Sequence, residues 1–74
     1  VFEVVNVGEL NEAFEDGSVI TEAALRESGL VSRNCDFVKI LGTGDLARKL
    51  TIQGAKVSTT AREKIEKAGG SIAA

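Results

Sequence analysis

A glycine-containing segment in the middle of the chain, "VKILGTGDLARKL" (residues 38–50), restricts the fold more than any other part of the sequence. An apolar run is followed at once by Gly42, Gly44 and Ala47, in the spacing G-x-G-x-x-A that dinucleotide-binding loops use. Such a loop has to open a crossover of at least about ten residues before the next parallel strand. Only "DLAR" separates Gly44 from the next strand-like segment, which begins at about Lys49. This spacing argues against a dinucleotide-binding fold.

Two further features of the sequence also argue against dinucleotide binding. The acidic residue of a dinucleotide fingerprint is expected about 20 residues after the first glycine, and that position falls at Arg62 and Glu63, inside a predicted helix. Asp45 lies at the mouth of the loop, where its carboxylate would repel phosphate. We therefore interpret the segment as a tight turn, in which Gly42 and Gly44 adopt backbone angles that other residues resist.

The length and composition predict one small globular domain. A chain of 74 residues supports a single core, and 43% hydrophobic with 27% charged residues is typical of a folded protein. No apolar run approaches the roughly 20 residues of a membrane span. The single cysteine, Cys35, excludes an internal disulfide or cysteine cluster and favours a reducing, cytoplasmic setting. We expect Cys35 to be a small buried or half-buried side chain.

Hydrophobic periodicity and capping residues predict an α/β arrangement. Thr21 and Ser58 can cap helices, with Thr60 and Glu63 as an alternative capping box for the last one. Gly54 suggests a bulge within the third strand. The predicted strands cover residues 2–5, 37–41, 50–57 and 71–73, and the predicted helices cover residues 9–15, 22–28 and 59–68, closed by Gly17, Gly29 and the pair Gly69 and Gly70.

The residues present give little support to catalysis. Histidine is absent, which excludes Ser/His/Asp and Cys/His nucleophiles and histidine-based metal sites. The neighbouring carboxylates Glu15 and Asp16 lie at a polar helix end and are interpreted as solvated charge. Tyrosine and tryptophan are absent, and we expect Phe2, Phe14 and Phe37 to lie in the core, which would leave no platform for base stacking. We expect a protein that is not an enzyme and that needs no cofactor and no metal.

Charge is unevenly distributed along the chain. Residues 1–32 contain seven acidic side chains and one basic one, whereas residues 33–74 contain eight basic and four acidic ones, within a net charge of -2. The second half of the chain can therefore supply a face that contacts phosphate.

The second half carries a set of residues whose order and spacing form a signature: Lys39, Ile40, Leu41, Gly42, Gly44, Leu46, Leu50, Ile52, Val57, Ser58, Ala61, Ile65 and Gly69. In this signature the sequence resembles a known family, the bacterial large-subunit ribosomal protein fifteen with its archaeal and eukaryotic relative eighteen-e. The segments "VVNVGEL" and "FEDG" extend the resemblance over nearly the whole chain.

The resemblance implies an irregular superhelix of β-β-α turns that packs on ribosomal RNA in the large subunit. Members carry a long, basic, glycine-rich N-terminal extension, whereas this sequence opens at Val1 directly as strand material. We expect residues 1–74 to be a single globular domain excised from a longer chain, without its basic arm. On this resemblance the turn of Gly42 and Gly44 is a fixed piece of the architecture. Gly69 and Gly70, which we expect to stop the last helix, complete the set of predicted structural turns.

Several basic residues of this domain are candidate RNA contacts. Arg48, Lys49 and Lys56 flank the glycine turn and the third strand, where they would form an edge for A-form RNA recognised by shape. Ser58 can leave helix amides near a phosphate. The full predicted set of RNA-binding residues is Lys39, Arg48, Lys49, Lys56, Ser58, Arg62 and Lys64.

The leading hypothesis is a structural, non-catalytic component of the large ribosomal subunit that binds ribosomal RNA. Its expected partners are ribosomal RNA and neighbouring ribosomal proteins, with no membrane and no small-molecule substrate, on cytoplasmic ribosomes or the organellar ribosomes that share the family. The isolated chain would be a monomer or a strand-exchanged dimer. The alternative hypothesis is an isolated or engineered domain that acts only as a structural or protein-protein interaction module, without autonomous RNA binding.

Overall fold

The computed structural model describes residues 2–73, which form three helices and six strands. Among them, no helix combines the length and the apolar character that crossing a membrane requires. The helices are α1 (Val7–Ala13), α2 (Glu22–Ser28) and α3 (Thr59–Lys67), and the strands are β1 (Phe2–Asn6), β2 (Val19–Ile20), β3 (Phe37–Leu41), β4 (Thr51–Gln53), β5 (Lys56–Val57) and β6 (Ser71–Ala73).

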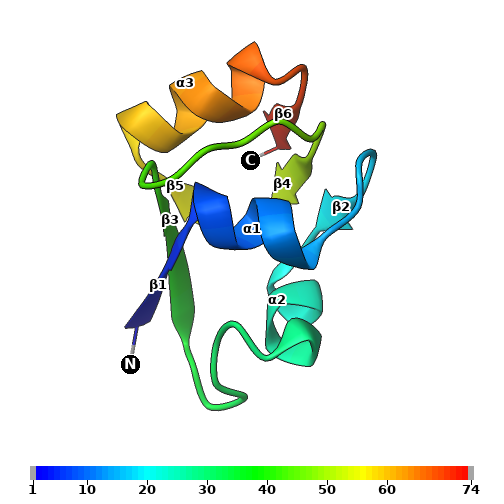
Figure 1. Ribbon diagram of the computed structural model, residues 1–74. Coiled ribbons are helices and arrows are strands. Elements are labelled where there is room, and N and C mark those ends of the chain that lie inside the picture. Colours follow the sequence, from blue (N-terminus) through cyan, green and yellow to red (C-terminus); the bar gives the residue numbers. More distant parts are fainter. Residues whose placement is uncertain (1, 74) are drawn as a thin grey trace.

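Successive strands along the chain belong to different sheets. Strands β1, β3 and β5 form one parallel sheet in that order, and β2, β4 and β6 form a second. Helix α1, the loop of residues 42–50 and helix α3 each lead from the first sheet to the second, and Figure 1 shows the loop between the two helices. The chain thus winds as an irregular superhelix, and the predicted α/β fold class is confirmed.

The core lies between the two sheets and the connections that cross from one sheet to the other. Each sheet contributes fully buried aliphatic side chains, such as Ile40 from β3 and Ile52 from β4. The helices add Leu10, Leu25 and Ile65, which have no exposed surface. Because burial of one such side chain contributes about 1.5–3 kcal/mol, these residues hold the small domain together. Cys35 is also buried, as predicted, and its Sγ donates to the Phe37 carbonyl oxygen at 2.8 Å.

Helices α2 and α3 begin and end close to where the sequence predicts. The Thr21 hydroxyl accepts from the Ala24 amide at 3.1 Å, and the Ser58 hydroxyl accepts from the Ala61 amide at 3.2 Å. Ser58 is therefore the cap of α3, and the alternative box is not used. Gly29 ends α2 in the left-handed conformation.

The prediction for α1 was wrong by two residues, since the helix covers residues 7–13 and not 9–15. The Asn6 amide donates to the Glu9 carboxylate at 3.1 Å, which starts the helix directly after β1. Phe14 already has extended backbone angles and ends it, so the prediction that Gly17 closes this helix was wrong. The buried residues of α1 are Val7 and Leu10.

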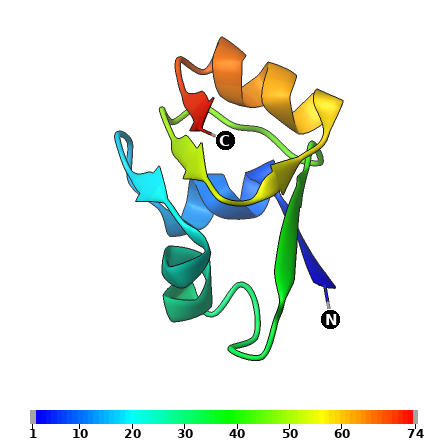
Figure 2. The ribbon, with the colours of Figure 1, turned by 180° about the vertical axis from the view of Figure 1, so that it is seen from behind.

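The predicted single strand over residues 50–57 was also wrong. The structure divides it into β4 and β5, which lie in different sheets, and Figure 2 shows the chain turning between them. Gly54, with a φ of +80°, lies at this corner and is no bulge within one strand. The buried positions Leu50 and Ile52 agree with the predicted alternation. Strand β2 was not predicted, because its two residues are too few to give a pattern.

The two central glycines serve different purposes. Gly44 has a φ of +93°, as predicted, and its Cα lies against the backbone of Gly8. Gly42 does not have a positive φ, so the backbone-angle prediction was wrong there. A Cβ at Gly42 would instead lie 2.5 Å from Cγ2 of Thr60 and 2.9 Å from the Ala61 amide nitrogen. Gly42 is therefore required for the close packing of the loop on α3.

The glycine pair Gly69 and Gly70 ends α3, as predicted. Gly69 has a φ of +92°, and the Gly70 amide donates to the Ile65 carbonyl oxygen at 2.9 Å. A Cβ at Gly70 would collide with the backbone of Leu50. The pair therefore turns the chain directly from α3 into β6.

The phenylalanines are not all in the core. Phe14 is half-buried against it, but Phe2 and Phe37 are 59% and 63% exposed, so the prediction that they are core residues was wrong. They pair in register on β1 and β3. Side chains alternate between the two faces of a strand, and here Val5, Val38 and the rest of the inner face fill the core.

Candidate nucleic-acid interface

Strand β5 aligns two lysines on the outer face of the first sheet. It pairs in parallel with β3, with Lys39 opposite Lys56 and Ile40 opposite Val57. Because neighbouring residues of a strand face opposite sides and Ile40 is fully buried, Lys39 and Lys56 lie side by side on the outer face. Like charges directly opposite each other are unfavourable, and an anion bound between them would relieve the repulsion.

The turn from β5 into α3 adds backbone donors next to these lysines. The Ser58 amide donates to the Ile40 carbonyl oxygen at 2.9 Å, which anchors the turn on β3. The Ser58 hydroxyl caps the Ala61 amide. The first amides of an α-helix have no carbonyl partner within the helix, and they carry the positive end of its dipole. Of the first residues of α3, Thr59 lines the groove together with the lysine pair, whereas Thr60 packs against Gly42.

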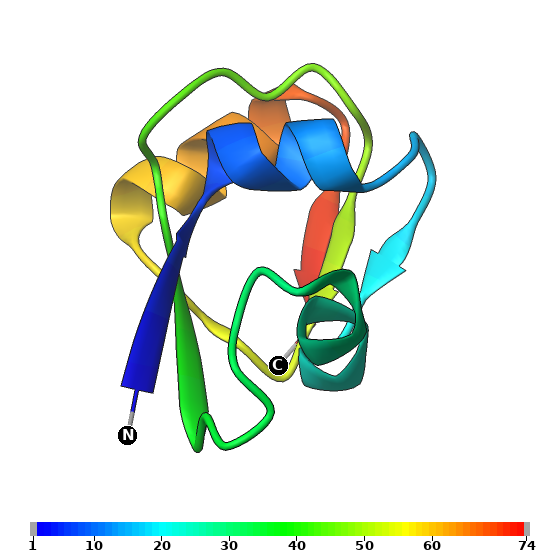
Figure 3. The same cartoon turned by 60° about the horizontal axis from the view of Figure 1, so that its bottom comes forward.

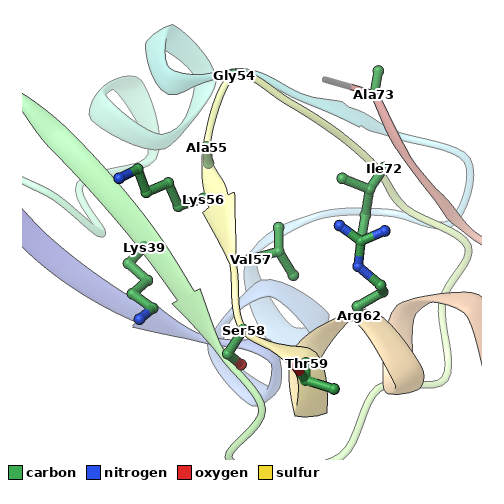
Figure 4. A pocket seen from close by; sticks show the side chains of 10 residues that line it. All are labelled: Lys39, Gly54, Ala55, Lys56, Val57, Ser58, Thr59, Arg62, Ile72 and Ala73. Atoms are coloured by element: carbon green, nitrogen blue, oxygen red, sulfur yellow. The ribbon is translucent and has the colours of Figure 1, made fainter.

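These elements line an open groove of about 760 Å³ (Figure 4). The lysines lie on one side of β5, and Arg62 of α3 lies on the other side, near Ile72. Three bases and no carboxylate occur among the described residues that line the groove, which are Lys39, Gly54, Ala55, Lys56, Val57, Ser58, Thr59, Arg62, Ile72 and Ala73. We call this set the basic groove.

The other three predicted contacts lie elsewhere. Arg48 donates from Nη1 to the Phe14 carbonyl oxygen at 2.7 Å, and Lys64 donates from Nζ to the Gly44 carbonyl oxygen at 2.6 Å. Lys49 lies over Gly69, where a Cβ would come within 3.1 Å of its Cε. The structure therefore brings Lys39, Lys56, Ser58 and Arg62 together, and it does not place Arg48 and Lys49 on one edge with Lys56.

The glycine loop is hydrogen-bonded to the rest of the protein through two amides and one carbonyl oxygen. The Ala47 amide donates to Oδ1 of Asn11 at 3.0 Å, and the Lys49 amide donates to Oδ1 of Asp16 at 2.6 Å. The Thr43 carbonyl oxygen accepts from the Gly8 amide at 3.1 Å. Residues 42–50 contain no helix. These hydrogen bonds fix the loop on α1 and on Asp16 beyond it. Because the segment leads from β3 in the first sheet to β4 in the second, it is a crossover loop, and the prediction of a tight turn was wrong.

One exposed feature next to the groove was not predicted from the sequence. Phe2 and Phe37, together with Val38, Lys39 and Lys56, line a second hollow of about 400 Å³. The sequence contained a signal for this feature, because alternate residues of a strand lie on the same face. Phe2 therefore shares a face with Val4, and Phe37 shares one with Lys39. Lys39 on the same face as Phe37 was the signal that this face is the outer one.

The fold and the groove together define a class of small α/β superhelical domains with a basic groove at the edge of one sheet. Comparison with known proteins identifies the family within this class. Residues 4–73 match the model of a family described as ribosomal proteins 50S-L15 and 50S-L18e together with their 60S counterpart. The chain belongs to this family, and the resemblance stated from the sequence is confirmed.

Individual relatives agree with the family match. The chain is 48% identical over 71 residues to large ribosomal subunit protein uL15 of Lactobacillus acidophilus, covering 96% of the chain and 48% of the relative. It is 44% identical over 71 residues to uL15 of Treponema denticola, covering 96% of the chain and 47% of the relative. It is 46% identical over 72 residues to uL15 of Geotalea daltonii, covering 97% of the chain and 49% of the relative. The chain spans about half the length of these relatives.

Proposed function

We propose that the chain is a structural constituent of the large ribosomal subunit, on cytoplasmic ribosomes, and that it binds ribosomal RNA through the basic groove without catalysing a reaction. Membership of a ribosomal protein family supports the assignment. The observation that carries the site is the convergence of three bases and the start of α3 on one groove whose described lining contains no carboxylate. Neighbouring ribosomal proteins are its further partners.

The groove bases are available for phosphate. Within residues 2–73 the structure gives Lys39, Lys56 and Arg62 no carboxylate partner, whereas Arg48 and Lys64 donate to backbone carbonyl oxygens. Neutralising RNA phosphates releases counterions and supplies much of the affinity of such proteins. Free ammonium and guanidinium groups can neutralise phosphates without first breaking an internal hydrogen bond. We therefore assign phosphate contact to the groove bases and a mainly structural role to Arg48 and Lys64.

The first amides of α3 add a directional contact. A phosphate oxygen placed between Lys56 and the start of α3 would accept hydrogen bonds from backbone groups that point along the helix axis. Ser58 contributes by capping Ala61, which fixes the first turn of the helix. In this arrangement Ser58 positions the amides and does not itself contact the RNA.

The test is binding of the 74-residue chain to fragments that together cover the large-subunit ribosomal RNA, each with a scrambled control. Affinity is measured by fluorescence anisotropy at about 50 and about 200 mM salt, because phosphate contacts make the affinity change strongly over this range. A variant with K39Q, K56Q and R62Q removes the groove bases. A control with R33Q, K49Q and K67Q removes three charges outside the groove, so both variants change the net charge from -2 to -5.

We expect specific, salt-sensitive binding to at least one fragment. The groove variant should lower the magnitude of the slope of log affinity against log salt by about 2–3, at roughly 0.7–0.9 for each lost phosphate contact. The control variant should change this slope by less than one. Equal slopes for the two variants would show that the groove is not the contact surface. Absence of specific binding by the wild-type chain would contradict RNA binding by this domain.

A further inference from the structure

The outer face of the first sheet carries two phenylalanines that the proposed phosphate contacts do not explain. Phe2 on β1 and Phe37 on β3 are paired in register and are both more than half exposed. In Figures 1 and 3, the N-terminal ends of β1 and β3 extend away from α1 and α3, so these helices do not cover the pair. Adjacent exposed aromatic side chains at one position typically mark a binding surface.

The aromatic pair is continuous with the basic groove. Lys39 and Lys56 line both the hollow against the two phenylalanines and the groove that leads to α3. Lys39 follows Phe37 by two residues on the same face of β3, a distance of about 6.6 Å along a strand. Val4, opposite Lys39 in the register, completes the apolar part of the face. Aromatic rings and ammonium groups thus form one surface.

This combination favours an unpaired nucleotide over an apolar protein segment. Single-stranded RNA is recognised by stacking its bases on aromatic side chains while basic residues follow the phosphates. An apolar partner would gain from Phe2 and Phe37 but would have to desolvate Lys39 and Lys56 without neutralising them. A nucleotide provides both a base for the rings and a negative charge for the lysines.

We propose that Phe2 and Phe37 form a stacking platform for an unpaired base of ribosomal RNA, whose adjoining phosphate lies against Lys39 and Lys56. The platform rests on the proposed function, because it extends the same RNA contact beyond the groove. It identifies the ligand of this face as a single-stranded loop, bulge or end of the RNA. A continuous duplex would leave the platform empty, since its bases stay stacked on one another.

The test compares ring-keeping and ring-removing variants on the fragment that binds best. The double variant F2L and F37L keeps an apolar surface but removes both aromatic rings, and the double variant F2Y and F37Y keeps the rings. V19L on β2 changes another exposed apolar residue, 52% exposed, in the other sheet and serves as the control. Urea melts verify that each variant is folded, and affinity is measured for the fragment alone and for the fragment annealed to its complement.

We expect the leucine variant to bind the unpaired fragment at least about five-fold more weakly, the lower end of what stacking of one base supplies. Its salt slope should equal that of the wild type, because no charge is removed. The tyrosine variant and V19L should bind like the wild type, and the annealed duplex should not distinguish the variants. Equal binding by the leucine variant overturns the platform while leaving the groove intact. Failure of the wild-type chain to bind any fragment overturns the proposed function as well.

Discussion

Replacement of Gly44 by alanine should destabilise the domain through two separable effects. The first is the backbone angle, since a φ of +93° is one that side chains with a Cβ resist, at about 1–2 kcal/mol. The second is crowding, because the new Cβ would lie 2.8 Å from Cα and 3.1 Å from the amide nitrogen of Gly8. Overpacking against groups that cannot rotate away costs about 1–3 kcal/mol.

The two effects together predict a loss of about 2–5 kcal/mol in the free energy of unfolding. A domain of 74 residues has a total of only about 4–11 kcal/mol, so the variant should be partly unfolded or close to it. With a urea dependence of about 1 kcal/mol per molar for a chain this small, the midpoint should fall by about 2 M or more. Circular dichroism during urea titration measures both quantities.

Gly17 provides the matched control. It has a φ of +88°, but nothing lies within 4 Å of the position that its Cβ would take. Gly17→Ala should therefore show the angle effect alone, at about 1–2 kcal/mol. If Gly44→Ala lost no more stability than Gly17→Ala, the loop would not be packed against Gly8 as described. If Gly44→Ala lost none, the conclusion that position 44 requires glycine would be refuted.

One further substitution, at Arg48, and one labelling experiment, on Cys35, have clear expected outcomes. Arg48→Gln removes the charged hydrogen bond to the Phe14 carbonyl oxygen and should lower the free energy of unfolding by about 1.5–3 kcal/mol, measured by urea melts. The salt slope of RNA binding, measured by anisotropy, should stay the same. A changed slope at full stability would instead make Arg48 a phosphate contact. Cys35, at 3% exposed with its thiol donating to Phe37, should react with a chromogenic disulfide only as fast as the domain unfolds, so rapid labelling without urea would show that the loop before β3 opens on its own.

Features set by a few neighbouring residues were predictable from the sequence. Helix α2 has the predicted bounds, because Thr21 and Gly29 act on the first and last turns of the same helix. Strand β3 likewise has the predicted bounds, residues 37–41. Helix α1 was misplaced because the carboxylate of Glu9 reaches back to the Asn6 amide, which starts the helix two residues before the apolar pattern suggests.

Features set by distant partners were not predictable. Nothing local distinguishes a bulge at Gly54 from a corner, because the difference lies in whether Lys56 pairs with β3 or continues the strand of Ile52. The candidate site is likewise set by distant partners. Its lysines were identified as bases from the sequence, but only the parallel register brings Lys39 beside Lys56. The position of Phe37 depended on which face of β3 the core occupies.

The alternation of strands between the two sheets also determines how the domain can fold. Within residues 2–73, no strand pairs with the strand next to it in sequence, so no hairpin is available as a nucleus, and each pairing must first close a loop that spans an intervening strand. Folding that depends on such distant pairings is slower than folding of a helical bundle of similar size, because loops must close before the contacts form. The second sheet receives its last strand only from residues 71–73. During synthesis, this sheet therefore cannot be completed until those residues have left the exit tunnel, and folding of the domain as a unit has to follow translation of its last strand.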